Sequence, residues 1–128
     1  MWAQLLVDGT LTFHAGIPKL AEIQHVVSVG AEPGYDLVEP VEIDDDGTTM
    51  WINEEGKYCG VETNEKATWL ADKRIMHGDR IMGDVLFTGG ADEDGETTSL
   101  SEAWAERLRD FNAHFKVITF GGGKAKIV

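Results

Sequence analysis

The chain is organised around residues 80–89, Arg80-Ile81-Met82-Gly83-Asp84-Val85-Leu86-Phe87-Thr88-Gly89. A short apolar run that ends at glycine is typical of a strand buried within a sheet. We therefore expect this segment to form a central apolar strand, and we interpret the rest of the sequence as the elements that surround it.

The segment from Ser99 to Phe115 has the strongest helical pattern in the sequence. Ser99 and Glu102 have the spacing of a capping box, in which each side chain bonds the free backbone N–H of the other residue. Apolar residues then recur three or four positions apart, at Leu100, Trp104, Leu108, Phe111 and Phe115. This stripe predicts a helix that packs on the sheet through one face.

Turn residues mark the other predicted strands. Asp8-Gly9 separates two apolar runs, and Asp-Gly is a strong hairpin signal because Gly adopts positive φ without steric cost. The predicted pairs are 2–7 with 10–14, 48–53 with 57–61, and 116–120 with 124–128. Residues 35–43 also have an extended pattern, but Pro40 cannot donate to a ladder, so this strand is expected at an edge or bulged at Glu39-Pro40.

Two further helices are expected. Pro18 is a favourable first helical residue, and Gly30 ends a pattern with Leu20, Ile23 and Val27 on one face. A weaker helix is predicted over 64–74. Its inward residues are Ala67, Leu70 and Ala71, and both Trp69 and Trp104 are expected in the core.

These elements predict an α+β domain with a mixed, largely antiparallel sheet of hairpins. Two or three helices pack on it, including the amphipathic helix near the C-terminus. We expect one domain over residues 1–128, with a core at about 2–120 and a Gly-rich basic tail or hairpin at 121–128. The single cysteine, Cys59, excludes an intramolecular disulfide and is expected to be buried. No apolar run reaches the ~18 residues of a membrane span, and we expect a cytoplasmic protein.

The charge is strongly and unevenly acidic. The formal net charge is −12. Residues 1–64 contain 12 Asp or Glu and only Lys19 and Lys57 as bases, whereas residues 65–128 contain 11 acids and nine bases. Such a field repels phosphate and attracts basic partners, which excludes nucleic acid and anionic membranes as direct ligands.

A run of acids without an intervening base forms the candidate partner-binding surface. Its residues are Asp36, Glu39, Glu42, Asp44, Asp45 and Asp46, together with Glu54 and Glu55 from the following turn. The alternative is ordinary solvated charge on an edge strand and on loop tips. Trp51 is either a core residue or, if it is exposed, an aromatic anchor for a partner.

No catalytic, metal or cofactor motif emerges from the sequence. The four histidines lack the short spacing of a zinc site, and the Asp-rich turns lack the alternation of an EF-hand loop. Phe120-Gly121-Gly122-Gly123-Lys124 is followed by Ala125 and not by Ser or Thr, unlike a phosphate-binding loop. His77-Gly78-Asp79-Arg80 contains the parts of an acid–base pair, but a turn leading into the central strand explains it better. We expect no catalytic residue, no metal and no cofactor.

Several segments in order resemble a known family. They are Trp51-Ile52-Asn53-Glu54-Glu55-Gly56-Lys57, then Gly60, Asn64, Ala67-Thr68 and Gly78-Asp79, then Gly83-Asp84-Val85-Leu86-Phe87-Thr88-Gly89-Gly90, and finally Asp94-Gly95-Glu96-Thr97-Thr98-Ser99-Leu100. Together they resemble the domain of unknown function 3846 family over roughly residues 2–115. The resemblance implies a small protein of bacteriophages, especially those of actinobacteria, or of mobile elements, without an established activity. Glu62, Glu65 and the basic tail from Gly121 depart from the family pattern.

We therefore expect a non-enzymatic protein, monomeric or homodimeric, that binds a host protein with a basic surface during infection, for host takeover or counter-defence. One alternative is a mimic of DNA whose carboxylates occupy a basic groove. Another is a small-ligand-binding protein or an enzyme that uses residues 77–90.

Overall fold

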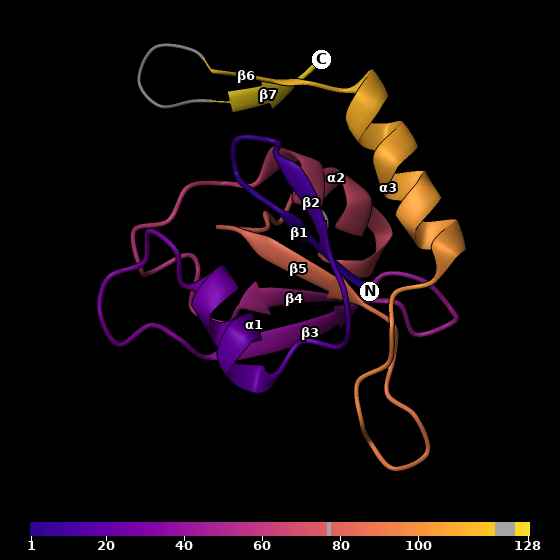
Figure 1. The fold of residues 1–128 in the computed structure, drawn as a ribbon. Coiled ribbons are helices and arrows are strands. Elements are labelled where there is room, and N and C mark those ends of the chain that lie inside the picture. Colours follow the sequence, from indigo (N-terminus) through magenta and orange to yellow (C-terminus); the bar gives the residue numbers. More distant parts are fainter. Residues whose placement is uncertain (77, 120–124) are drawn as a thin grey trace.

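Strand β5 (Val85–Thr88) lies at the centre of a five-stranded antiparallel sheet, which confirms the central strand expected from the sequence (Figure 1). The computed structural model describes residues 1–76, 78–119 and 125–128. The strand order is β2-β1-β5-β4-β3. The other members are β1 (Trp2–Leu5), β2 (Leu11–His14), β3 (Val38–Glu42) and β4 (Thr49–Asn53).

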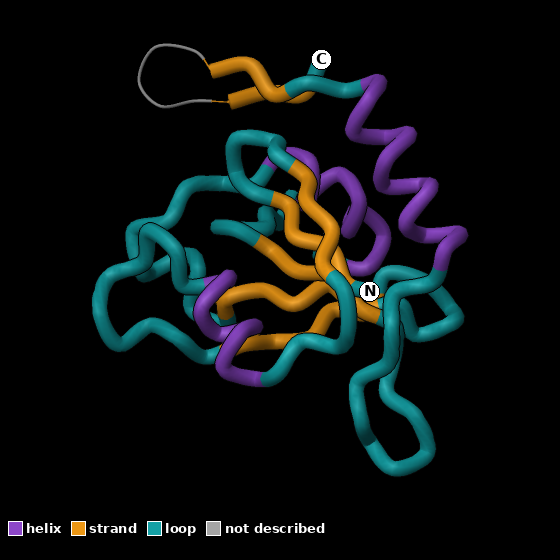
Figure 2. The backbone as a smooth tube through the Cα atoms, in the orientation of Figure 1, coloured by secondary structure: helices purple, strands orange, loops and turns teal. Residues whose placement is uncertain are grey.

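Helices cover both faces of this sheet (Figure 2). Helix α1 (Leu20–Val27) packs on one face. Helix α2 (Glu65–Ala71), which a 3₁₀ turn extends over Asp72–Arg74, and helix α3 (Glu102–His114) pack on the other. A separate two-stranded hairpin, β6 (Val117–Thr119) with β7 (Ala125–Ile127), follows α3. The observed α+β architecture is the predicted one.

The alternation of side chains along β5 divides the core in two. Val85 and Phe87 face α2 and α3, where they join Met50, Trp104 and Leu108 in the main core. Leu86 faces the other way and packs with residues that include Trp2, Ile23 and Val26. All four residues of β5 are buried, because both faces of the sheet are covered at its centre.

Strand β5 is shorter than predicted, because the chain turns before Val85. Gly83 has φ of +82°, in the left-handed region that breaks an extended strand. The next residue, Asp84, is buried and accepts a hydrogen bond of 2.9 Å from the Val7 N–H. Residues 80–84 therefore approach the sheet without belonging to its central strand.

The predicted hairpin between 48–53 and 57–61 is wrong. Strand β4 pairs with β3 on one side and with β5 on the other, so neither edge is free for a third strand. Tight turns follow Asn53 instead, since its Oδ1 accepts from Glu55 N and its carbonyl accepts from Gly56 N. Cys59 is fully buried in this segment, as expected.

Helix α3 begins later than predicted. Its N-cap is Ser101, whose Oγ accepts from the backbone N–H of Trp104 at 3.2 Å. Ser99 does not cap the helix, because its hydroxyl lies 2.6 Å from the N-terminal amine of Met1. The apolar stripe is confirmed, with Leu100, Trp104, Leu108 and Phe111 buried and Phe115 half-buried.

Two expected core residues lie at the surface. Leu20, at the start of α1, is 60% exposed, whereas Val26, which was not among the predicted core residues, is buried. Trp69 of α2 is 54% exposed, and its ring stacks on that of Phe111 with the ring centroids 4.9 Å apart. Helical periodicity alone could not distinguish these positions from the core.

The edge position predicted for the Pro40 strand is confirmed, since β3 is the last strand of the sheet. The predicted opening hairpin is confirmed as β1 and β2, and the predicted C-terminal pairing as β6 and β7. Residues 120–124 of that tail lie outside the described residues. None of the helices in the described ranges has the length and apolar character needed to cross a bilayer.

Candidate binding cleft

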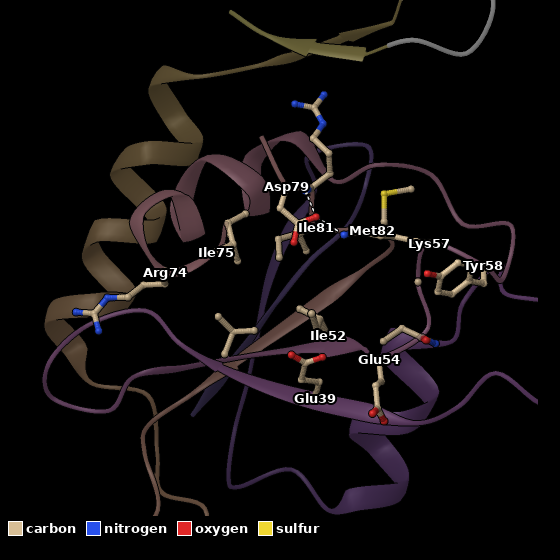
Figure 3. Close-up of a pocket in the computed structure, with 14 residues that line it drawn as sticks. Glu39, Ile52, Glu54, Lys57, Tyr58, Arg74, Ile75, Asp79, Ile81 and Met82 are labelled. Atoms are coloured by element: carbon tan, nitrogen blue, oxygen red, sulfur yellow. Dashed lines mark hydrogen bonds and ion pairs between the residues drawn. The ribbon is translucent and has the colours of Figure 1, made fainter. Parts of the chain in front are cut away.

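A cleft of about 390 Å³ lies between the β3–β4 end of the sheet and the segment that leads from α2 toward β5 (Figure 3). Its apolar lining consists of Val41, Ile52, Ile75, Ile81 and Met82. Its polar and charged lining includes Glu39, Glu54, Lys57, Tyr58, Arg74, Asp79 and Arg80. The volume lies within the range of small-molecule and side-chain binding sites.

Strand alternation directs residues of β3 into this cleft. Glu39 is paired with Ile52 of β4 in the sheet register, so the two side chains share the face that carries α2 and α3. Val41 lies two residues further along the same face. Figure 3 shows the Glu39 carboxylate beside Ile52, and the Glu54 side chain further along the chain with its carboxylate directed away from Glu39.

The opposite wall comes from two turns that are distant in sequence. The turn after β4 carries Lys57 and Tyr58, and the segment after α2 carries Arg74 and residues 79–82. Gly56 allows these turns to meet, because a Cβ at this position would lie 2.9 Å from Met82 Cβ. Tertiary packing therefore assembles the wall.

The three cations of the cleft are all in ion pairs. Lys57 pairs with Asp79, Arg74 pairs with Asp45 at 2.7 Å, and Arg80 pairs with Glu65 at 2.9 Å. The hydrogen bond from Lys57 is the main reason that the pKa of Asp79 is below its ordinary value, and the Arg80 N–H contributes. Glu39 and Glu54 take part in no ion pair among the described residues, so the unbalanced charge of the cleft is negative.

Asp44, one of the predicted partner-binding acids, is directed inward. Its carboxylate accepts hydrogen bonds from the backbone N–H groups of Asp46 and Thr48, from the Thr48 hydroxyl and from the Trp104 indole. Burial alone would raise the pKa of Asp44, but these hydrogen bonds outweigh it and hold the pKa below its ordinary value. Asp44 therefore joins the β3–β4 turn to α3.

The remaining acids of the predicted surface do not form one row. Asp36 and Asp46 are exposed in loops at opposite ends of β3, and Asp45 is engaged with Arg74. Glu42 is exposed but points to the sheet face opposite to that of Glu39. Glu55 is half-buried in the turn after β4. Only Glu39 and Glu54 of the set line the cleft.

Trp51 is half-buried and lies on the α1 face, away from Glu39. Its indole N–H donates to Thr88 Oγ1 at 2.9 Å, which fixes the ring orientation. The ring lines a second groove of about 470 Å³ with Ile17 and Leu20. Trp51 was expected either in the core or at the surface. Its half-buried ring packs against the core on one side and lines the groove on the other.

The structure brings part of the 77–90 region to the cleft. Asp79 and Arg80 line it, whereas His77 lies outside the described residues. No group of three or more His, Cys, Asp or Glu in the described ranges is arranged to hold a metal ion. The arrangement can hold a cationic group beside the Glu39 carboxylate while the apolar stem of that group lies against Val41 and Ile52.

Sequence reasoning missed most of the cleft wall. Tyr58, which is 77% exposed, fell within the wrongly predicted hairpin, and Ile75 followed the end of a weak helix. A third hollow, of about 290 Å³, shares Ile75 and Asp79 with the cleft and is also lined by Asp72 and Met76. A possible signal was the adjacency of charged and apolar residues around Ile75, but such mixtures are common in loops.

Comparison with known proteins identifies a family over most of the chain. The family model described as Domain of unknown function (DUF3846) matches residues 5–113, which include strands β2 to β5, helices α1 and α2, all of α3 except His114, and the cleft. No curated protein and no solved structure matches the chain. The chain belongs to the DUF3846 family.

Proposed function

We propose that this chain is a protein-binding module that takes a basic segment of a partner protein into the cleft. The observation that carries the proposal is the position of Glu39 and Glu54. Both residues line a cleft with an apolar floor, and every cation of its lining is engaged by another acid. An Arg or Lys side chain fits this chemistry, because its alkyl stem packs on apolar surface while its charge pairs with carboxylates.

The rest of the surface supports the same kind of partner. The net charge of −12 repels acidic proteins and nucleic acid, and it accelerates encounter with basic surfaces. The family resemblance suggests that the partner is a bacterial host protein and that the contact serves infection or counter-defence. The proposal assigns no reaction to the chain.

The experiment compares two variants with the same change in charge. Glu39→Gln with Glu54→Gln removes the two carboxylates of the cleft. Glu93→Gln with Asp94→Asn removes two exposed carboxylates from the 90–98 loop, where they line none of the three hollows described above. Each protein is immobilised and exposed to bacterial lysate at low and high salt, and captured proteins are identified by mass spectrometry.

We expect the wild type and the loop variant to capture the same basic protein at low salt. The cleft variant is expected to bind that protein with an affinity at least tenfold lower. A tenfold loss corresponds to about 1.4 kcal/mol, within the range for a charged pair at an interface. Equal capture by all three proteins contradicts the role of the cleft, and capture of nothing at either salt contradicts the proposed function.

The second candidate is binding of a small organic cation in the same cleft. The volume of about 390 Å³ favours it, and Asp79 and Arg80 of the 77–90 region line the same cleft. Spermidine and arginine serve as probes in isothermal titration calorimetry. Saturable binding that Glu39→Gln with Glu54→Gln abolishes supports this candidate, and absence of heat at millimolar probe contradicts it. The DNA-mimic alternative gains no comparable observation, because Glu39 and Glu42 lie on opposite faces of β3.

A further inference from the structure

The two edges of the main sheet differ in how they can meet another chain. At the β3 edge, Ile43 N donates to Thr48 O and Glu54 N donates to Leu37 O. Every second residue from Leu37 to Ile43 therefore directs its backbone N–H and C=O toward β4. The backbone groups of Val38, Pro40 and Glu42 therefore point away from β4. Pro40 offers no N–H at the middle of this edge, so β3 is protected against pairing.

The β2 edge lacks this protection. Leu6 N donates to Thr10 O, so the backbone groups of Leu11 and Phe13 point away from β1. Among the described strands β2 pairs only with β1. Its sequence, Leu11-Thr12-Phe13-His14, contains neither proline nor an acidic residue.

The surroundings of β2 are the acid-poor side of the molecule. Residues 9–21 contain no Asp or Glu, and residues 111–128 contain none either. The two stretches are neighbours in space, because a Cβ on Gly9 would lie 3.2 Å from a methyl group of Val117. Arg109 of α3 lies over the Phe13 ring at 4.4 Å. A second copy of a chain with net charge −12 meets the least repulsion on this side.

We propose that two copies of this chain associate through β2, with the strands antiparallel across a two-fold axis at Thr12. In this register Leu11 of each copy lies opposite Phe13 of the other copy. The outward N–H and C=O groups of Leu11 and Phe13 then all form hydrogen bonds between the two copies. The two five-stranded sheets then form one continuous sheet of ten strands. Each Thr12 faces Thr12 of the other copy as a non-hydrogen-bonded pair, with the Cβ atoms about 4.5–5.5 Å apart. This interface is independent of the cleft.

Thr12 provides a sharp test, because its side chain is exposed and points to the α1 face. Thr12→Glu and Thr12→Lys each place like charges opposite one another, whereas an equimolar mixture of the two places opposite charges together. Sedimentation equilibrium measures the mass of each sample over a range of concentrations. Circular dichroism and thermal unfolding check that both variants remain folded.

We expect the wild type to move from 14.1 kDa toward twice this mass as its concentration rises. Each variant alone is expected to remain a monomer, and the mixture is expected to recover the dimer. A wild type that stays at 14.1 kDa overturns the proposal, as does a Thr12→Glu variant that dimerises as the wild type does.

A second measurement covers a failure of the charged variants to fold. Thr12→Cys is expected to form an intermolecular disulfide on mild oxidation, since the Cα atoms of a non-hydrogen-bonded antiparallel pair lie about 4.5 Å apart, within the range of disulfides. Ala103→Cys, on the exposed side of α3, is the control and is expected to remain reduced. The native Cys59 is buried and does not compete. Equal cross-linking of both variants contradicts a specific β2 interface.

Discussion

Single carboxylates in this chain have different roles because their surroundings differ. Asp44 receives four hydrogen bonds, Asp84 is buried beside one backbone donor, and Glu39 is exposed with no ion pair among the described residues. The sequence presents all three simply as acids. Local contacts determine which of them stabilise the fold and which are available to a partner.

Asp44→Asn is expected to lower the free energy of unfolding by about 1–3 kcal/mol, because an amide NH₂ then faces the donors Thr48 Oγ1 and Trp104 Nε1. The pKa of Asp44 is depressed in the folded state, so its contribution is present above the ordinary value of 3.8 and is lost as the pH falls through the folded pKa. Urea unfolding at pH 7 and at progressively lower pH measures this difference, which should shrink in acid. Asp45→Asn is the neighbouring control, since the Asp45 side chain is 97% exposed and is expected to matter little.

Asp84→Asn is expected to stabilise the protein at neutral pH. Burial raises the pKa of Asp84 against the opposing effect of the Val7 N–H, and nearby Asp8 raises it further. A raised folded pKa means that the contribution of Asp84 to stability is complete below 3.8 and is lost as the pH rises through the folded pKa. The amide removes the buried charge and keeps an oxygen for the Val7 N–H. Thermal unfolding should show a higher Tm for the variant at pH 7, and a variant less stable than the wild type there would contradict this account.

At the scale of elements, termini and edges depend on contacts that periodicity does not contain. Ser99 and Ser101 both precede the apolar stripe of α3, and both are helix-capping residue types. Only Ser101 caps, because Ser99 lies against the N-terminus of the chain. Similarly, β4 could have paired with the segment after it, but β3 and β5 already occupy both of its edges.

Ser101→Ala is expected to lower the free energy of unfolding by about 1 kcal/mol, the usual cost of losing an N-cap side chain. Ser99→Ala is expected to cost less, because its hydroxyl bonds lie at the exposed chain terminus. Chemical denaturation of both variants compares them directly. A larger decrease in the free energy of unfolding for Ser99→Ala than for Ser101→Ala would contradict Ser101 as the N-cap of α3.

At the scale of the whole molecule, excess negative charge opposes compaction and favours basic partners. The net charge of −12 is shared by a chain of 128 residues. Ion pairs such as Arg74 with Asp45 balance part of it locally. The acid-poor β2 side and the cleft that Glu39 and Glu54 line are distinct surfaces, and we propose the first for a second copy and the second for a basic partner.

Added salt is therefore expected to stabilise the isolated protein, since it screens repulsion among the carboxylates. The Tm should rise between about 10 mM and 500 mM NaCl, the range over which the Debye length falls from about 30 Å to a few ångströms. Glu93→Gln with Asp94→Asn reduces the repulsion and should show a smaller rise. A Tm that falls with NaCl would show that attractive ion pairs, and not repulsion, dominate.

The sequence by itself determined the elements and the overall charge. The apolar stripe of α3, the Asp8-Gly9 hairpin and the apolar strand around Val85 each follow from residues within a few positions of one another. These patterns fix secondary structure because they act through local backbone geometry and side-chain periodicity. The edge position of β3 also followed from the sequence, since Pro40 cannot donate to a central ladder.

Only the tertiary structure decided which of these elements became neighbours. Strand β5 lies between β1 and β4, the turn after β4 meets the segment after α2, and Asp44 turns toward Trp104 while Glu39 remains in the cleft. These contacts join residues that are far apart in the chain. Which of them form depends on which segments bury the most apolar surface against one another. The cleft and the open β2 edge are consequences of that selection, so no local pattern could have revealed them.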